Sequence, residues 1–215
     1  MLVQIFTFRH SKNVAMFCES VALALDLDVD LLNVAGMYHD IGKMNYPEAF
    51  SENQDGKNIH DDLDPELSYL IITRHVGDSL IYLLQIPEMP RAVMKMVSQH
   101  HGNTVLRYFA KKANSKMQDN YRYKCSRPSC IESAILMICD CIEATARALA
   151  SNGELENAED RIKLVETSCK RLIDDKQIDD VKIGQLRVIK SVLIKELGNI
   201  YHKREIYGDE KGEEE

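Results

Sequence analysis

The sequence lacks the features of a membrane or secreted protein. No apolar run approaches the roughly 20 residues that cross a bilayer. The first ten residues, MLVQIFTFRH, do not combine the charged region, apolar core and small-residue cleavage site of a signal peptide. Tryptophan is absent, while hydrophobic residues make up 45% and charged residues 28% of the chain, as in ordinary soluble proteins. We therefore predict a cytoplasmic protein.

The cysteines offer neither a disulfide framework nor a zinc motif. The six cysteines are irregularly spaced and form no Cys-x-x-Cys pair. Cys125 and Cys130 lie close together, but no second pair accompanies them to complete a zinc site. Free thiols are typical of a reducing compartment, and this pattern supports the same cytoplasmic prediction.

The chain also lacks a net positive charge, because 27 lysines and arginines are outnumbered by 34 aspartates and glutamates and the formal net charge is −7. A protein that binds nucleic-acid polymers needs a basic surface to displace counterions, so this class is disfavoured. A small anionic ligand remains compatible, since a local site can oppose the overall sign. The sequence contains no glycine-rich phosphate loop and no useful β-type alternation.

Helical periodicity dominates, so we predict an all-α fold. Apolar residues recur at spacings of three and four between Val14 and Leu25. Asp28 or Asp30 caps a second predicted helix, which runs toward His39 and is stopped by Gly42. Further helices are expected at 65–85, around 93–97, at 128–150, and near 154–175 and 180–206. Polar loops are expected at 43–62 and 113–127.

The stretch AGMYHDIGKM places His39 directly before Asp40. Neighbours on a helix do not face one another, so the two side chains are poorly placed for an ion pair of their own. They are well placed to present two ligands to a group that lies across the helix end. Asp140 is a second unusual acid, because it interrupts the apolar helix ILMICDCIEA. A buried carboxylate is unfavourable unless it is paired or bound to a cation.

Seven such residues terminate or interrupt apolar segments. Taken singly, each histidine has an ordinary interpretation, such as a core residue or a helix end. The set is His10, His39, Asp40, His75, His100, His101 and Asp140. Imidazoles and carboxylates are the usual ligands of iron, manganese or zinc, and seven donors exceed the four of a tetrahedral zinc ion. They suit two metal ions that share a bridging carboxylate, as in enzymes that hydrolyse phosphate esters.

The same residues, in this order, carry a family resemblance. The segments FRHSKNV, YHDIGKM, SENQ, NIHDDLDPELSYLIITRHVGD, QHHGNTVLRYF, ICDCIEATARAL and IYHKREIY resemble the cytoplasmic HD domain of the seven-transmembrane-receptor cyclic-di-AMP phosphodiesterases. That family belongs to the HD-domain metal-dependent phosphohydrolases. The likeness implies a helical bundle with additional C-terminal helices. It also implies a single HD domain over residues 1–207, followed by an acidic disordered tail at 208–215.

The resemblance implies which of these residues bind each metal ion. His10, His39 and Asp140 would bind one divalent ion, and His75, His100 and His101 would bind the other, with Asp40 bridging. The ions would be iron or manganese, and the reaction would convert cyclic di-AMP into linear pApA. Lys43 would assist catalysis by holding a phosphate oxygen.

The substrate loop is expected to contribute two further contacts. Arg122 would bind the second phosphate, and Tyr121 or Tyr123 would stack on an adenine. Glu52, Asn53, Gln54 and His60 match the family pattern, either as substrate contacts or as residues that fix the loop.

Departures from the family pattern keep alternatives open. Ile59 stands where proline is common, and YRYKCSRP lacks the usual Pro-Gly, so another nucleotide or phosphodiester is an alternative substrate. Cyclic di-GMP is disfavoured, because no Gly-Tyr-Pro signature follows His101-Gly102. A non-catalytic cyclic-dinucleotide sensor is a further alternative, although its expected sign, a broken ligand set, is not found.

The surroundings of the domain are expected to vary. Related full-length proteins carry receptor and membrane parts ahead of this domain at the cytoplasmic face of the membrane, so this chain is either an excised domain or a stand-alone version. A homodimer is left open. The helices after residue 154 are either packed within the chain or serve as an oligomerisation arm, because their apolar stripe includes Leu186, Ile189 and Leu193.

Overall fold

The structure, a computed structural model, describes residues 3–54, 58–114, 116 and 118–201, with the backbone alone for residues 3–6. Across these residues the chain is helical, and its only β feature is an isolated bridge between Val105 and Arg122. The α-helices are α1 (Val3–Leu25), α2 (Val29–Tyr38), α3 (Pro65–Leu84), α4 (Arg91–Gln99), α5 (Arg107–Lys112), α6 (Ile131–Ser151), α7 (Ala158–Asp174) and α8 (Ile183–Ile200). The all-α prediction is confirmed.

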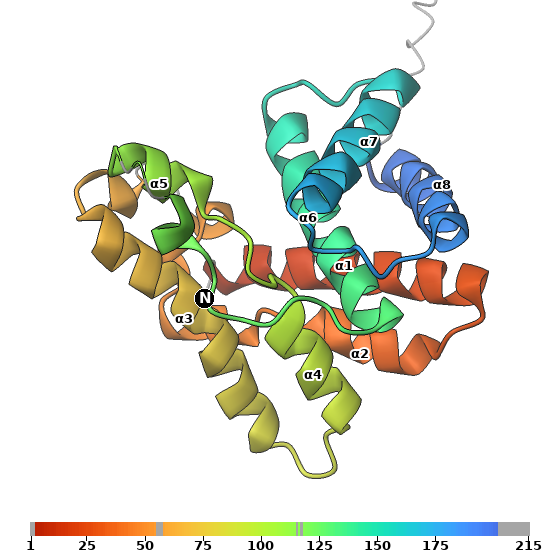
Figure 1. Ribbon diagram of the computed structural model, residues 1–215, viewed down its shortest axis with the longest axis horizontal. Coiled ribbons are helices and arrows are strands. Elements are labelled where there is room, and N and C mark those ends of the chain that lie inside the picture. The colour runs from red at the N-terminus through yellow and green to blue at the C-terminus, as the bar shows by residue number, and fades with distance from the viewer. Residues whose placement is uncertain (1–2, 55–57, 115, 117, 202–215) are drawn as a thin grey trace, which may run out of the picture.

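Helix α6 lies at the centre of the bundle. It contacts α1, α2, α4, α7 and α8 (Figure 1). Ile135, Leu136, Ile138 and Ile142 on this helix are fully buried, which explains why its sequence is apolar on nearly every side. Asp140 is therefore carried on the most buried helix of the fold. Within the described part of the chain, no helix has the length and apolar character needed to span a membrane.

The C-terminal helices pack inside the same chain. Helix α8 contacts α1 and α7, and its Ile189, Leu193 and Leu197 are fully buried. The apolar stripe considered for an oligomerisation arm is therefore used for intrachain packing. Helix α7 begins later than predicted, at Ala158, because Asn157 and Asp160 form a capping box. The predicted extension of the last helix to residue 206 and the predicted tail at 208–215 lie outside the described residues.

The end of α2 differs from the prediction. The helix ends at Tyr38, before the His39–Asp40 pair, and residues Ile41–Asn45 form a short 3₁₀ helix, η1. Gly42 does not end the helix through a left-handed conformation. Its role is close packing, because a Cβ at this position would lie 2.1 Å from the backbone oxygen of His75 on α3. The histidine and aspartate thus lie in a turn that is pressed against α3.

The long loop before α3 is built from short turns. Three more 3₁₀ segments follow η1, namely η2 (Pro47–Ala49), η3 (Ser51–Asn53) and η4 (Ile59–Asp61). Helix α3 then starts as predicted, with Pro65 as its first residue and the Asp64 carboxylate accepting hydrogen bonds from the backbone of Glu66 and Leu67.

Candidate metal centre

The seven predicted ligand residues converge at one place in the fold. They come from α1, the turn after α2, α3, the end of α4, and α6. Their donor atoms form two sets, each lying within 4.8 Å: His10, His39, Asp40 and Asp140; and Asp40, His75, His100 and His101. This grouping is the one that the family resemblance implied. Binding of ions to these residues stays a prediction.

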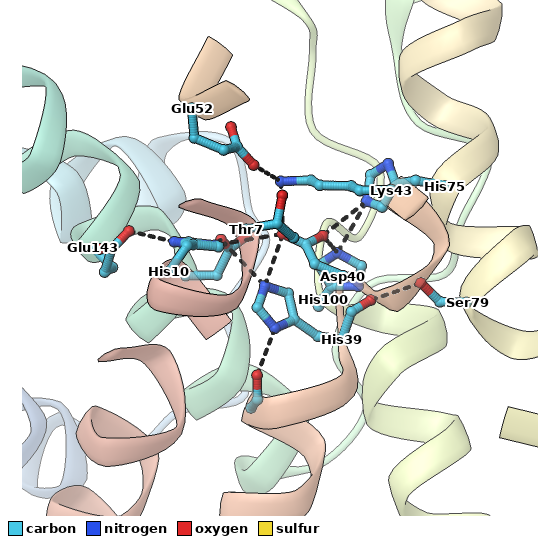
Figure 2. Close-up of polar contacts among 12 residues, drawn as sticks. Thr7, His10, His39, Asp40, Lys43, Glu52, His75, Ser79, His100 and Glu143 are labelled. Atoms are coloured by element: carbon cyan, nitrogen blue, oxygen red, sulfur yellow. Dashed lines mark hydrogen bonds and ion pairs between the residues drawn. The ribbon is translucent and has the colours of Figure 1, made fainter. Parts of the chain in front are cut away.

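Asp40 lies between the two sets, and its two carboxylate oxygens face different ones (Figure 2). Oδ1 lies 3.3 Å from Nε2 of His75 and 3.7 Å from Nε2 of His100. Oδ2 lies 3.4 Å from Nε2 of His10 and 3.2 Å from Nε2 of His39. A carboxylate oriented in this way is suited to bridge two cations.

Three of the histidines are oriented by the backbone of their own helical turn. Nδ1 of His39 donates to the carbonyl of Gly36 at 2.8 Å. Nδ1 of His75 and Nδ1 of His100 donate to Ile72 and Val97, each at 2.6 Å. Because a carbonyl only accepts, each Nδ1 carries a proton, and in the neutral imidazole Nε2 keeps its lone pair. The second nitrogen of a metal-binding histidine is commonly held in this way.

The Nε2 atoms of these histidines are arranged to bind a cation. Nε2 of His75 faces Nε2 of His100 at 3.3 Å, so two acceptors point at each other. Nε2 of His101 also lies 3.2 Å from Nε2 of His75. Nε2 of His39 is fully buried and has no hydrogen-bond partner among the described residues. Buried acceptors without a donor are unfavourable. One metal ion in each donor set would satisfy these acceptors.

The two sets differ in charge. Burial lowers the pKa of His39, but the carboxylates of Asp40 and Asp140 outweigh it and raise the pKa to about 9. Burial and the neighbouring His39 lower the pKa of His100 to about 3. Burial also lowers the pKa of His75 and His101. One set therefore attracts positive charge strongly, while the other offers neutral imidazoles, which are the form that binds metals.

His10 is oriented by a residue that the sequence analysis missed. Its Nδ1 donates a short hydrogen bond to Oε2 of Glu143, which is only 1% exposed. Oε1 of Glu143 accepts a hydrogen bond of 3.0 Å from Asn13. Glu143 lies three positions after Asp140, hence on the same face of α6. That spacing was the one signal for it in the sequence.

Lys43 lies beside the metal-binding residues, between two acids. Its Nζ lies 2.6 Å from Oδ2 of Asp40 and 2.7 Å from Oε1 of Glu52 (Figure 2). Burial lowers its pKa, but these two carboxylates outweigh that effect and raise it. The ammonium therefore stays charged and joins the loop before α3 to the His39–Asp40 turn. A phosphate contact by Lys43 stays a prediction.

The other loop residues of the family pattern bond within the loop or to α1. The amide of Asn53 donates to Oγ1 of Thr7 and to the carbonyl of Pro47, at 2.8 Å and 3.1 Å. The amide of Gln54 donates to the carbonyl of Glu48 at 3.0 Å. Nε2 of His60 donates to the carbonyl of Ala49 at 2.8 Å. These contacts fix the loop.

A cavity of about 660 Å³ opens onto the metal-binding residues. His10, His75 and Asp140 line it, together with Lys43 and Tyr123. The Tyr123 ring packs on the His101 ring, with centroids 4.4 Å apart and planes 31° from parallel. The cavity is large enough for a ligand of nucleotide size.

The other two predicted substrate residues do not line this cavity. Tyr121 packs edge-on against Tyr69, 5.7 Å between ring centroids. The Arg122 guanidinium pairs with Asp119 at 2.6 Å and with Asp175 at 2.9 Å. A phosphate bound by Arg122 would have to displace these carboxylates. The phosphate contact therefore stays a prediction.

The loop between α7 and α8 holds the turn that carries His100 and His101. The Asn103 backbone N–H donates to Oε1 of Gln177 at 3.2 Å, and the Gln177 amide donates to Oδ1 of Asn103 at 2.7 Å. Gly102 adopts a left-handed conformation with φ of +52°, and a Cβ there would lie 2.4 Å from Oε1 of Gln177. No local pattern in the sequence indicated this contact.

Comparison with known proteins agrees with the geometry. The chain is 35% identical over 216 aligned residues to the cyclic-di-AMP phosphodiesterase PgpH of Listeria monocytogenes, an alignment that covers 95% of this chain and 29% of that protein. It is 31% identical over 180 residues to the 3'3'-cGAMP-specific phosphodiesterase 1 of Vibrio cholerae, covering 82% of this chain and 37% of that protein. The chain thus spans about a third of each relative.

A solved structure matches over nearly the whole fold. The L. monocytogenes PgpH HD domain in complex with cyclic-di-AMP superposes with a TM-score of 0.83 at 34% identity, covering 92% of each chain. The HD domain profile itself matches residues 7–145, which include all seven predicted ligands. This chain therefore belongs to the HD domain family.

Proposed function

We propose that this chain is a metal-dependent phosphodiesterase that hydrolyses cyclic di-AMP to linear pApA. The observation that carries the proposal is the pair of donor sets that share Asp40 beside a cavity of about 660 Å³. Relatives named as cyclic-dinucleotide phosphodiesterases support the substrate class. The solved HD domain with cyclic-di-AMP supports the adenine-containing substrate.

The chain would hold two divalent ions, iron or manganese, with the ligands grouped as described above. Nitrogen and oxygen donors of this kind suit either metal. When bound, the ions would polarise phosphate oxygens and lower the pKa of the attacking water. Asp40 would hold both ions at a fixed separation. Lys43 would place its charge near a non-bridging phosphate oxygen, because its Nζ lies at the edge of the cavity.

Metal analysis and product identification on one sample test this function. Freshly purified protein should contain divalent metal and release pApA from cyclic di-AMP. Asp40→Ala should lose metal and turnover together, since Asp40 belongs to both donor sets. Asp30→Ala is a matched control, because Asp30 is exposed in the first turn of α2. Full activity in a metal-free Asp40→Ala protein would contradict the proposal.

A second candidate keeps the reaction and changes the nucleotide. The relative specific for 3'3'-cGAMP favours this alternative, as do the departures in the substrate loop. A panel of cyclic di-AMP, 3'3'-cGAMP, cyclic di-GMP and linear dinucleotides would separate the two, with kcat/KM as the measure. A sensor without catalysis would instead bind a cyclic dinucleotide tightly and leave it intact.

We also propose that the protein acts in the cytoplasm. The corresponding domain of its relatives would lie at the cytoplasmic face of the membrane. All six cysteines are free, which suits a reducing compartment. Fractionation of cells that produce the native protein would test this, and recovery from an extracellular fraction would contradict it.

A further inference from the structure

Helix α3 carries an apolar stripe that no described residue of the chain covers. Leu67, Leu70, Ile81 and Leu84 are 47%, 60%, 57% and 70% exposed. With Arg74 and Gly77 they follow spacings of three and four along the whole helix, the pattern of a helix face that packs on another helix. We call these six residues the α3 stripe. Figure 1 shows α3 along an edge of the molecule.

No contact among the described residues explains Gly77, in the middle of the stripe. A Cβ at this position would have nothing within 4 Å. Glycine in a helix interior is unfavourable relative to alanine, and a surface position does not require it. Its absent side chain does allow another chain to approach closely, as small residues do at helix crossings.

We propose that the α3 stripe is a self-association surface on which two copies of this chain pair with their α3 helices antiparallel. The spacing of the stripe is symmetric about the midpoint between Arg74 and Gly77. An antiparallel pair therefore places Leu67 opposite Leu84 of the second copy, and Leu70 opposite Ile81. A two-fold interface requires this kind of self-complementary pattern.

The charges at the centre select the antiparallel orientation. The Arg74 side chain is 76% exposed, and its Nε lies 3.3 Å from Oδ2 of Asp78 in the same chain. In the antiparallel pair, Arg74 enters the space left by Gly77 of the second copy. It then lies next to the Asp78 there, which is 7% exposed and already pairs with the Arg74 of its own chain. Two guanidinium groups then meet two carboxylates. A parallel pair would set Arg74 against Arg74 and glycine against glycine, which combines repulsion with a void.

The pairing leaves the metal centre free. His75 and Ser79 lie on the buried side of α3, at 2% and 0% exposure, whereas the α3 stripe lies on its exposed side. A change in the stripe should therefore alter association without altering the metal-binding residues. This separation makes the inference testable independently of the proposed activity.

Sedimentation velocity over a wide range of protein concentration is the first test. The wild-type chain should pass from monomer to dimer as concentration rises. Ile81→Glu should remain monomeric under the same conditions, because it places a carboxylate opposite Leu70. Leu23→Glu is the matched control, since Leu23 is 65% exposed on α1 outside the stripe, and this variant should dimerise like the wild type. A wild-type chain that is monomeric at every concentration would overturn the proposal, as would an Ile81→Glu variant that still dimerises.

Disulfide cross-linking tests the orientation. Mixed Leu70→Cys and Ile81→Cys proteins should form a cross-linked heterodimer on mild oxidation, because these positions face each other in the antiparallel pair. Each variant alone should cross-link no more than wild type, which measures the background from the native thiols. Circular dichroism and metal content should match the wild type in all variants. Efficient cross-linking of Leu70→Cys to itself would overturn the antiparallel arrangement.

Discussion

The backbone of Gly42 lies directly against the carbonyl of His75, so close that a Cβ on residue 42 would be 2.1 Å from that oxygen. Ser79 on the next turn of α3 accepts a hydrogen bond of 2.9 Å from the Gly42 N–H and donates one of 2.9 Å to the carbonyl of His39. The turn that carries His39 and Asp40 is thereby fixed to the helix that carries His75. Donors from both sets are held in one rigid unit.

Gly42→Ala should therefore damage both stability and metal binding. A methyl group cannot fit beside the His75 carbonyl, so the turn must move away from α3. Overpacking of this kind typically destabilises by about 1–3 kcal/mol. Urea denaturation and metal content of the purified protein would measure the two effects. Gly184→Ala on α8 is the control, because a Cβ there meets nothing within 4 Å, and a similar loss in that variant would refute the interpretation.

Glu143→Gln should weaken one metal site selectively. The substitution keeps an acceptor near Nδ1 of His10 but removes the negative charge that makes the imidazole a stronger ligand. Loss of such a partner commonly lowers metal affinity by roughly 10–100-fold. Competition with a chelator should show one weakened class of ion and one unchanged class. Glu132→Gln, in the first turn of the same helix, should bind both ions normally, and equal affinities in the two variants would contradict this role.

Gln177→Ala should loosen the turn that follows His101. The side chain is 1% exposed and makes two hydrogen bonds to Asn103, so its removal leaves buried polar groups unpaired. The expected loss of stability is about 1–3 kcal/mol, together with weaker metal binding. Asp174→Ala removes only an exposed ion pair with Lys170 and should change stability by about 0.5 kcal/mol or less. If the two variants behave alike, the loop between α7 and α8 does not support the site.

Tyr123 and Tyr121 should differ in their effect on substrate binding. Tyr123 lines the cavity and packs on His101, whereas Tyr121 packs on Tyr69 elsewhere. Stacking of a base on an aromatic ring contributes about 1–3 kcal/mol, so Tyr123→Leu should raise KM roughly 5–150-fold. Tyr121→Leu should leave KM of the folded enzyme unchanged. A rise in KM in the Tyr121 variant alone would reverse the assignment.

Removal of metal should lower thermal stability. A bound cation would satisfy the facing lone pairs of His75 and His100 and the Nε2 of His39, which has no hydrogen-bond partner among the described residues. A ligand present at a hundred times its Kd stabilises the folded state by about 2.7 kcal/mol. Differential scanning calorimetry with and without a chelator should show the shift, and manganese should restore it. Asp40→Ala should show no response, and a chelator shift of normal size in that variant would contradict its bridging role.

Much of the helical framework could be predicted from the sequence, because its signals are local. The Asp64 cap, the Pro65 start of α3 and the apolar face of α1 are confirmed. The predicted end of α2 was wrong, because glycine was interpreted as a helix stop. Its actual constraint is the close approach of α3, a contact between segments more than thirty residues apart.

The substrate loop shows what residue type alone leaves undetermined. An arginine and two tyrosines in a polar loop suggested a phosphate contact and a stacking contact from one of the two rings. The structure separates them, because Arg122 is neutralised by Asp119 and Asp175, and Tyr121 joins a small aromatic cluster with Tyr69. Which aromatic ring lines a cavity depends on the packing around it, and residue type alone does not determine this.

The sequence by itself determined the family, the helical class and the chemical types of the candidate metal ligands. Periodicity, capping residues and ligand chemistry are properties of short stretches of chain. Only the tertiary structure decided that Asp40 faces both donor sets and that Glu143 orients His10 across a separation of 133 residues. It also decided that the α3 stripe stays exposed. Such relationships depend on how distant helices pack, which no local pattern encodes.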